Sequence, residues 1–179
     1  MTFQSRIATF DDIDAIKRLM SLSIKTVLPD VLSPAQVKKS HESMGLDTQL
    51  IEDGTYFLIF ESEILVGCGG WSRRRTLFGG NHTTGRDDSL ADPKSEPAKI
   101  RAMYTHPDHI RRGIGRMLLN LGEAAARTEG FKVIELGATA SGILLYEKFG
   151  YDVVKDLTVV EEDGVSVPII RMRKHLGAD

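Results

Sequence analysis

The sequence predicts a single mixed α/β domain that spans residues 1–179. Apolar segments with the character of strands alternate along the chain with segments that repeat apolar residues every three or four positions, as amphipathic helices do. No internal repeat, low-complexity tract or Gly/Ser/Pro-rich linker divides these segments. A chain of 179 residues has the ordinary length of one domain with its own core. We therefore expect one mixed sheet flanked by helices.

The first third of the chain predicts a strand, two helices and a hairpin. Thr9 and Asp12 form a capping pattern ahead of an apolar stripe that starts at Ile13. Ser33-Pro34 supplies the N-cap and first position of a second helix. Two apolar runs then flank Glu61-Ser62-Glu63, which is typical of an antiparallel hairpin. The expected elements are a strand over 3–7, helices from 13 and over 34–43, and strands over 55–60 and 64–70.

Residues 72–97 predict a long loop, because they are polar, contain several Gly and Pro residues and lack a sustained period. Loops of this length inside a domain are often functional. Ile114, Leu118 and Ala125 then recur at helical spacing up to Gly130, a C-cap signal. The remaining expected elements are strands over 99–105 and 132–136, a helix over 143–149, and a terminal hairpin of strands 151–160 and 165–172 around 161–164.

Composition restricts the class of protein. The 23 basic and 25 acidic residues nearly balance, which argues against bulk electrostatic binding to nucleic acid. The one cysteine, Cys68, cannot form an internal disulfide and is expected to be a small apolar strand residue in a reducing compartment. The N-terminal residues do not resemble a signal peptide, and no apolar run is long enough to span a membrane. We therefore expect a cytoplasmic protein without a membrane partner.

The histidines give no metal signal. They are scattered singly, without the spacing of metal ligands, so no metal site is expected. His106 precedes Pro107 at the predicted end of a strand, and we expect it to shape the turn rather than to act as a base.

The strongest functional signal is the basic turn before the helix that starts near residue 114. Gly113 and Gly115 allow positive φ angles and a close approach of the backbone to a ligand. The N–H groups and the dipole of the following helix attract anions, and Arg111, Arg112 and Arg116 add positive charge. The pattern predicts a pyrophosphate-binding turn.

Two other phosphate-binding patterns do not fit this turn. The chain has no Gly-Lys-Ser/Thr tripeptide, so it lacks the Walker motif. Leu118 stands where the dinucleotide fingerprint has its third glycine, and the turn lies well past mid-chain.

Three segments in this order resemble the GNAT superfamily of N-acetyltransferases. They are the strand over 100–107, the loop over 111–116, and the segment over 146–151 that runs Tyr-Glu-Lys-Phe-Gly-Tyr. The resemblance implies transfer of an acetyl group from the cosubstrate acetyl-CoA to an amine, and a parallel strand pair that splays apart. Two positions depart from the family pattern. Ile110 replaces a polar residue of the loop, and Thr139 replaces an asparagine.

The resemblance also implies a set of site residues. The pantetheine arm would bond to the backbone between the splayed strands, and the diphosphate would lie at the loop. Tyr146 would bond to or protonate the departing thiolate; the alternative is an aromatic ring that only packs beside the sulfur. The cofactor-binding residues implied are Met103, Tyr104, Thr105, Arg111, Arg112, Gly113, Ile114, Gly115, Arg116, Thr139 and Tyr146.

The general base and the acceptor are less constrained. Glu135, in the strand across the implied gap, either accepts a proton from the amine or faces solvent on a half-exposed strand. The arginines and carboxylates of 72–97 either meet the acceptor or form a solvated loop. We expect the amine of a small molecule as acceptor. The alternatives are a protein N-terminus or lysine, or a CoA-binding regulatory module without catalysis, and a homodimer is left open.

Overall fold

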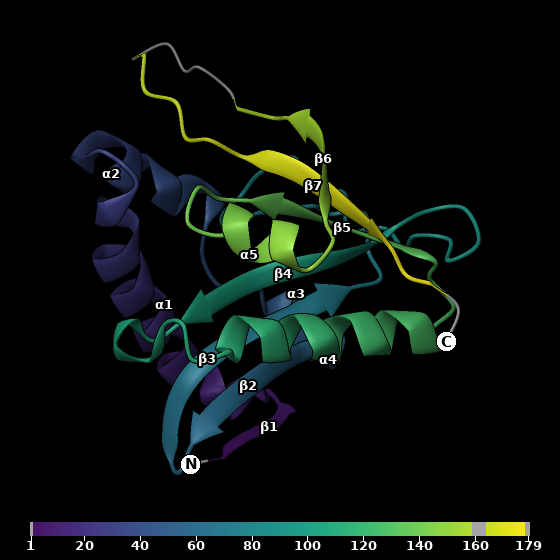
Figure 1. The fold of residues 1–179 in the computed structure, drawn as a ribbon, viewed down its shortest axis with the longest axis horizontal. Helices are drawn as coiled ribbons and strands as arrows, with labels where there is room; N and C mark the ends of the chain where they lie inside the picture. The colour runs from purple at the N-terminus through teal and green to yellow at the C-terminus, as the bar shows by residue number, and fades with distance from the viewer. Residues whose placement is uncertain (1, 159–163, 178–179) are drawn as a thin grey trace.

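The computed structural model describes residues 2–158 and 164–177. Over these residues the chain forms a seven-stranded mixed sheet with the order β1-β2-β3-β4-β5-β7-β6 (Figure 1). β4 and β5 run parallel, and the other neighbours run antiparallel. The strands are β1 (Phe3–Ile7), β2 (Tyr56–Glu61), β3 (Ile64–Ser72), β4 (Ala98–Thr105), β5 (Val133–Ala138), β6 (Asp152–Asp156) and β7 (Ile170–His175). The α-helices are α1 (Ile13–Val27), α2 (Pro34–Ser43), α3 (Thr48–Glu52), α4 (Ile114–Thr128) and α5 (Ile143–Lys148).

The predicted succession of strands and helices is confirmed, with one additional helix. The capping patterns at Thr9 and Ser33 are both present, each with its reciprocal hydrogen bonds. The sequence analysis missed α3, whose five residues are too few to show a helical period. Asp47 caps this helix by accepting a hydrogen bond from the N–H of Gln49 at 3.2 Å.

The terminal hairpin pairs as predicted, but its predicted bounds were wrong. β6 ends at Asp156, and β7 begins at Ile170 and extends to His175. Pro168 has no N–H group to donate to a ladder, so residues 165–169 do not continue a regular strand. Residues 161–163 of the predicted turn, and the last two residues of the first predicted strand, lie outside the described residues.

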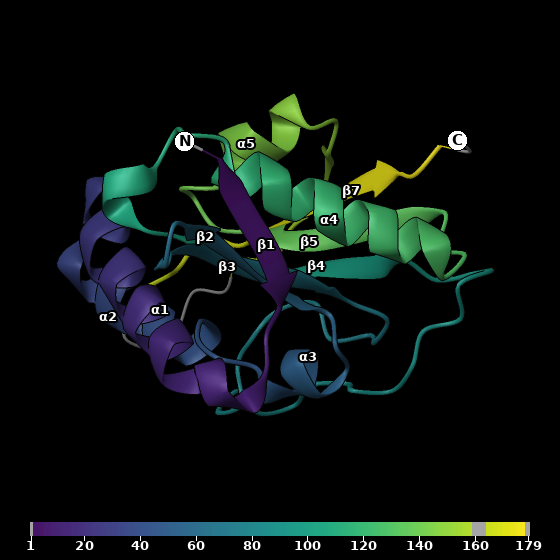
Figure 2. The ribbon, with the colours of Figure 1, turned by 90° about the horizontal axis from the view of Figure 1, so that it is seen from below.

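Helices cover both faces of the sheet (Figure 2). α4 and α5 lie on one face, and α1, α2 and α3 lie on the other. The buried stripe of α1, which includes Ile16 and Leu19, packs against Leu58 and Cys68 of the central strands. On the opposite face α4 approaches β4 closely, because Gly122 has no Cβ to meet the side chain of Ile100.

β4 and β5 separate soon after they begin. Their parallel pairing is confined to Ala98 with Ile134 and Lys99 with Glu135 within the described chain. Farther along β4, two residues, Ala102 and Met103, oppose the single residue Gly69 of β3, and this arrangement is a β-bulge. Ala102 has a φ of 51° in this bulge. Such a bulge bends its strand and increases the local twist. The splayed parallel pair implied by the family resemblance is thus confirmed.

Tyr56 of β2, on the far side of β3, holds this bulge in place. Its hydroxyl donates a hydrogen bond to the carbonyl of Ala102 at 2.8 Å, and its side chain is buried. Replacing Tyr56 by Phe leaves the partly buried carbonyl of Ala102 without this donor, so we expect a loss of about 1–2 kcal/mol in the free energy of unfolding. Urea denaturation measures the loss. A midpoint equal to that of the unchanged protein would show that the bulge does not depend on this hydrogen bond.

Candidate active site

Two adjoining cavities lie where β4 and β5 diverge. The larger, of about 360 Å³, extends from the end of β4 to the loop before α4 and to α5. The smaller, of about 80 Å³, lies between β4, β5 and residues 44–45 and 77–79. Both cavities are lined by Met103, Tyr104, Thr139 and Tyr146. A ligand in one cavity therefore meets a ligand in the other beside these four residues.

The loop before α4 gives the larger cavity a cationic end. Arg111 and Gly113 both have left-handed backbone conformations, with φ of 62° and 89°. Gly113 is the N-cap of α4. No other group lies within 4 Å of the position that a Cβ would take there, so the backbone is open to a ligand. Arg111 and Arg116 line the same cavity as this helix N-terminus. Helix N–H groups and positively charged residues at one place are the features of an anion-binding site.

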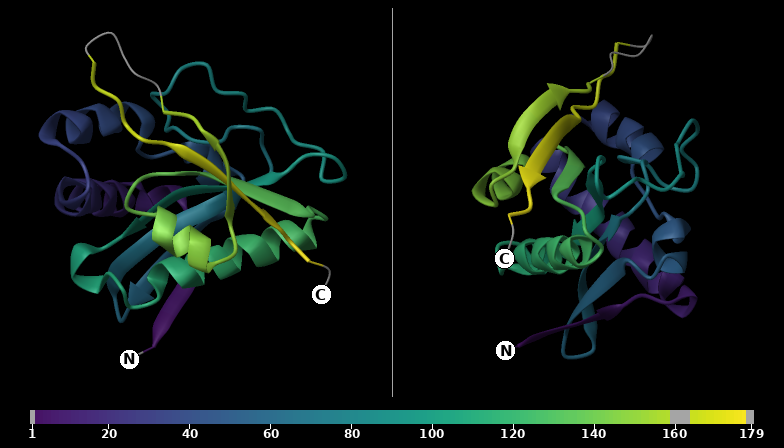
Figure 3. Two further views of the ribbon diagram at one scale, coloured as in Figure 1. Left: turned by 45° about the horizontal axis from the view of Figure 1, so that its top comes forward. Right: turned by 90° about the vertical axis from the view of Figure 1, so that its right-hand side faces the viewer.

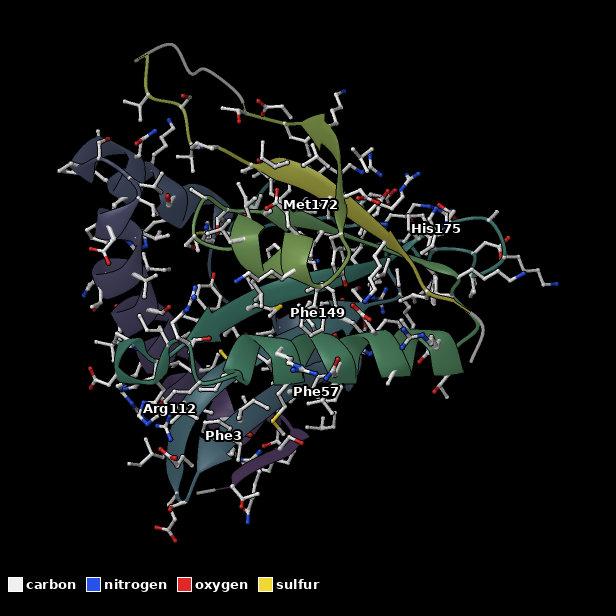
Figure 4. The ribbon with its side chains drawn as sticks, in the orientation of Figure 1. Phe3, Phe57, Arg112, Phe149, Met172 and His175 are labelled. Atoms are coloured by element: carbon white, nitrogen blue, oxygen red, sulfur yellow. The ribbon has the colours of Figure 1, made fainter. Side chains whose placement is uncertain are left out.

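Arg112 lies in the same loop but points elsewhere. Its guanidinium pairs with Glu61, with Nη1 at 2.9 Å from Oε2, and stacks over the ring of Phe3 at 5.3 Å (Figure 4). This hydrogen bond lowers the pKa of Glu61 below its usual range. Of the predicted cofactor-binding residues, all but Arg112 line the larger cavity. The predicted contribution of the Arg112 side chain is therefore not supported by the geometry.

The exposed edge of β4 forms the middle of the larger cavity. Met103, Tyr104 and Thr105 line it, and beyond Lys99 this strand has no pairing partner in the described part of β5. Backbone groups on this edge are free to bond to an extended ligand, as an added strand would. The phenol oxygen of Tyr104 is engaged differently, because it accepts a hydrogen bond from the N–H of Gly45 at 3.1 Å.

Tyr146 lies on α5 at the junction of the two cavities. Its ring packs over Gly142, where a Cβ would come within 2.6 Å of Cε2. The ring also makes an edge contact with Tyr151, with the centroids 6.0 Å apart. Burial raises the pKa of Tyr146 to about 12, so its hydroxyl stays protonated through the neutral range. This residue can donate a hydrogen bond to a ligand atom at the junction.

Glu135 is neither exposed nor part of either cavity. It is fully buried, so the expected alternative of a solvent-facing carboxylate is wrong. Its Oε1 accepts from Nε of Arg173 at 2.7 Å, and its Oε2 accepts from Nε of Arg171 at 3.0 Å. Burial acts to raise the pKa of Glu135, but the two arginines outweigh it and the pKa lies below its usual range. Glu135 is therefore the centre of a cluster of ion pairs. This geometry does not support the predicted role of Glu135 as the general base.

A second buried ion pair, which the sequence analysis missed, fixes the wall of the smaller cavity. Nη2 of Arg101 donates to Oδ2 of Asp47 at 2.9 Å and to the carbonyl of Gly79 at 2.7 Å. Its Nη1 donates to the carbonyl of Thr76 at 3.2 Å. These bonds attach residues 76–79, which include the cavity-lining Leu77 and Phe78, to β4. No sequence pattern connects Asp47 with Arg101, 54 residues later.

The predicted loop over 72–97 is confirmed for the residues that follow β3, where a single bridge joins Arg74 and Leu90 (Figure 3). Its first three arginines pair within the chain. Arg73 pairs with Glu129, Arg74 with Asp53 and Arg75 with Glu96, each within 2.8 Å. Of the two alternatives for this loop, contact of these arginines with an acceptor is not supported, because none of them lines either cavity.

The described residues contain neither a cluster of metal ligands nor a helix that could span a membrane. Within 2–158 and 164–177, no group of three His, Cys, Asp or Glu side chains is placed to hold a metal ion. His106 accepts a hydrogen bond from the N–H of Asp108 at 3.2 Å, in the turn that it was expected to shape. None of the described helices has the length and apolar character needed to cross a membrane.

Comparison with models of protein families assigns the chain to one family. The family model described as the acetyltransferase (GNAT) family matches residues 25–151. No curated protein sequence matches the chain. Solved structures match over nearly the whole chain, at low identity, and so they bear on the fold alone.

Three of these structures illustrate the match. A GCN5-related N-acetyltransferase from Rhodopseudomonas palustris has a TM-score of 0.70 and 18% identity, covering 98% of this chain and 96% of its own. The PaiA N-acetyltransferase from Thermoplasma acidophilum, solved with coenzyme A, has a TM-score of 0.64 and 13% identity, covering 98% and 99%. YncA from Salmonella typhimurium, solved with acetyl-CoA, has a TM-score of 0.66 and 18% identity, covering 100% and 96%.

Proposed function

The chain belongs to the GNAT family of acetyltransferases, which use acetyl-CoA as cosubstrate, and we propose that its acceptor is the primary amine of a small molecule. The observation that carries this proposal is the meeting of two cavities at Tyr146. The larger cavity has the size and the cationic end that a pantetheine diphosphate needs. The smaller has room for a compact acceptor only.

The residues of the larger cavity fit acetyl-CoA in their chemistry. Arg111, Arg116 and the N-terminus of α4 would hold the diphosphate, because both charge and N–H donors converge there. The unpaired edge of β4 from Met103 to Thr105 would bond to the amides of the pantetheine arm. When bound, acetyl-CoA supplies an acetyl thioester that an amine can attack.

We assign to Tyr146 the stabilisation of the departing sulfur. A thiol has an ordinary pKa of about 8.5, and the phenol of Tyr146 has a pKa of about 12. Complete proton transfer from the phenol to the thiolate is therefore unfavourable, because the phenol is the weaker acid. A hydrogen bond from the hydroxyl to the developing thiolate has no such penalty. Hydrogen bonds to charged groups contribute about 1.5–3 kcal/mol. This supports the hydrogen-bonding role over full protonation.

The shape of the smaller cavity supports a small acceptor over a protein. Met44 and Gly45 line it from the segment after α2, and Phe78 and Ile169 line it from the long loop and the residues before β7. A polypeptide N-terminus or a lysine side chain would have to enter between these segments.

A buried Cys68 thiol without a disulfide is consistent with our proposal that the protein acts in the reducing cytoplasm.

Release of CoA thiol from acetyl-CoA across a panel of primary amines tests the proposed function. We expect release that depends on the amine, with the acetylated amine detected by mass spectrometry. Acetylation of added proteins or peptides but of no small amine would instead identify a protein acceptor. CoA binding without acetylation of any acceptor would identify a regulatory module.

The loop arginines are expected to differ in their effect on CoA affinity. Because Arg111 and Arg116 line the larger cavity, replacing either by Gln should weaken CoA binding about tenfold or more, the loss of one charge-assisted phosphate contact. Calorimetric titration measures the dissociation constant. Arg112→Gln removes the same charge from a side chain already paired with Glu61, so it should change the constant less than threefold. Equal losses in all three variants would contradict the assigned side-chain directions.

A further inference from the structure

We propose that the acceptor is a weakly basic primary amine on a small apolar body, of the class of α-amino acid amides, rather than a strongly basic alkylamine. This inference rests on the proposed function and concerns the chemistry of the smaller cavity. The distinction matters because only the neutral form of an amine can attack a thioester. An enzyme without a carboxylate near the amine has to take that neutral form from solution.

Among the residues that the structure describes, none gives the smaller cavity an anion or a base for an amine. Within the described chain, no Asp, Glu, His or Lys lines it. Its lining residues are Met44, Gly45, Leu77, Phe78, Gly79, Ile100, Arg101, Ala102, Met103, Tyr104, Leu136, Gly137, Thr139, Tyr146 and Ile169. The ionisable groups among them are two phenols and one guanidinium. Burial raises the pKa of both Tyr104 and Tyr146, so neither becomes an anion near neutral pH.

The carboxylates next to this cavity already have cationic partners. Asp47, behind Arg101, pairs with both Arg101 and Arg86 at 2.9 Å. Glu135, adjacent in sequence to the lining residue Leu136, pairs with Arg171 and Arg173. An ammonium group in the cavity would therefore be desolvated without a counter-ion and would lie near the Arg101 cation. Burying an unpaired charge is costly, so the cavity disfavours the protonated amine.

The fraction of neutral amine then decides between acceptor classes. An alkylamine with a pKa of about 10.4 is about 0.1% neutral at pH 7.4, whereas an α-amino group with a pKa of about 7.8 is about 30% neutral. The supply of the reactive form thus differs by roughly 300-fold. A more basic amine is the stronger nucleophile, which offsets part of this difference.

The walls of the smaller cavity indicate the size and polarity of the group that carries the amine. Phe78, Leu136 and Ile169 are apolar, and the volume of about 80 Å³ admits a short aliphatic group. Leucinamide and 3-methylbutylamine make a matched pair for this cavity. They share the same branched chain and primary amine, and they differ in the carboxamide that lowers the amine pKa.

The first test compares these two amines at pH 7.4 by thiol release and orders the full amine panel by pKa. We expect kcat/KM for leucinamide to exceed that for 3-methylbutylamine by about 30-fold or more, given the difference in neutral fraction. The kcat/KM for the alkylamine should rise about tenfold per pH unit from pH 6 to 9, without an inflection from an enzyme base. Turnover concentrated on amines with a pKa above 9, or an enzyme inflection between pH 5.5 and 7, would overturn the inference.

The second test adds the missing anion. Met44 lines the smaller cavity at the end of α2, and Met44→Glu would give an ammonium group a counter-ion there. We expect the ratio of kcat/KM for alkylamine to amide to rise about tenfold in Met44→Glu relative to Met44→Gln, which has the same size without the charge. Equal ratios in the two variants would overturn the inference and leave the proposed function intact. No thiol release from any amine, with CoA bound, would overturn both.

Discussion

Replacing Tyr146 by Phe is expected to lower kcat about 100-fold while the dissociation constant for CoA changes less than threefold. Tyr146 lines both cavities, and its hydroxyl stays protonated because burial raises its pKa to about 12. Loss of a hydrogen bond to a developing thiolate costs about 1.5–3 kcal/mol, equivalent to roughly 10–150-fold in rate. The aromatic ring and its contacts remain, so the binding of CoA should not depend on the hydroxyl. Steady-state kinetics and calorimetric titration measure the two quantities.

Tyr151 supplies a matched control for this experiment. It forms the edge contact with Tyr146, but its hydroxyl donates to Oε1 of Glu123 at 3.0 Å and it lines neither cavity. Tyr151→Phe should reduce stability and leave kcat within about threefold. Equal loss of kcat in both variants would assign the loss to disturbed packing around the two rings and not to the Tyr146 hydroxyl. An unchanged kcat in Tyr146→Phe would show that only the ring is needed, the alternative that the sequence left open.

Replacing Glu135 by Gln is expected to reduce the free energy of unfolding by about 3 kcal/mol at neutral pH, since removing one partner of a buried ion pair has effects of this size. Glu135 has no exposed surface, and it holds Arg171 and Arg173 of β7 against β5. Lys99, also buried, would lose its nearest carboxylate at 3.8 Å. Urea denaturation measures the change. Glu129→Gln, which removes one partner of a more exposed pair with Arg73, should cost less than about 1 kcal/mol.

The contribution of Glu135 should also depend on pH with a definite sign. Its pKa is lower in the folded protein than in the unfolded chain, so folding is favoured by the ionised form. The stability it contributes is therefore fully present above the unfolded pKa of about 4.3 and is lost as pH falls through the folded value. The difference between the two proteins should shrink as pH falls below 4. A difference that grows on acidification would contradict the ion-pair assignment.

The same variant decides whether Glu135 has a catalytic part. A structural ion-pair centre outside both cavities predicts a kcat within a few-fold of the unchanged enzyme, assayed at a temperature where the variant is folded. A loss of 100-fold or more in kcat, with CoA binding retained, is the size expected for a missing general base. That result would restore the role first inferred from the sequence.

Local sequence signals were sufficient for much of the fold and for the cofactor end of the site. The capping residues Thr9 and Ser33, the helical stripe of α4 and the paired runs of β2 and β3 were each predicted correctly. Gly113 and its neighbours predicted a turn with positive φ at the start of α4, which the structure has, because such a backbone conformation is a property of a few consecutive residues. The bounds of β7 were misplaced, since strand ends depend on the partner strand as well as on the strand itself.

The sequence by itself therefore determined the succession of elements, the basic glycine turn before α4 and the position of Tyr146 in its motif. Only the tertiary structure decided which charged side chains face the cavities. Arg111 and Arg112 are adjacent in sequence, yet one lines the larger cavity and the other pairs with Glu61 of β2. Caps, turns and periods arise among neighbours in the chain. The partner of a charge is whichever distant segment the fold brings within a few ångströms, and that partner decides whether the charge is available to a ligand.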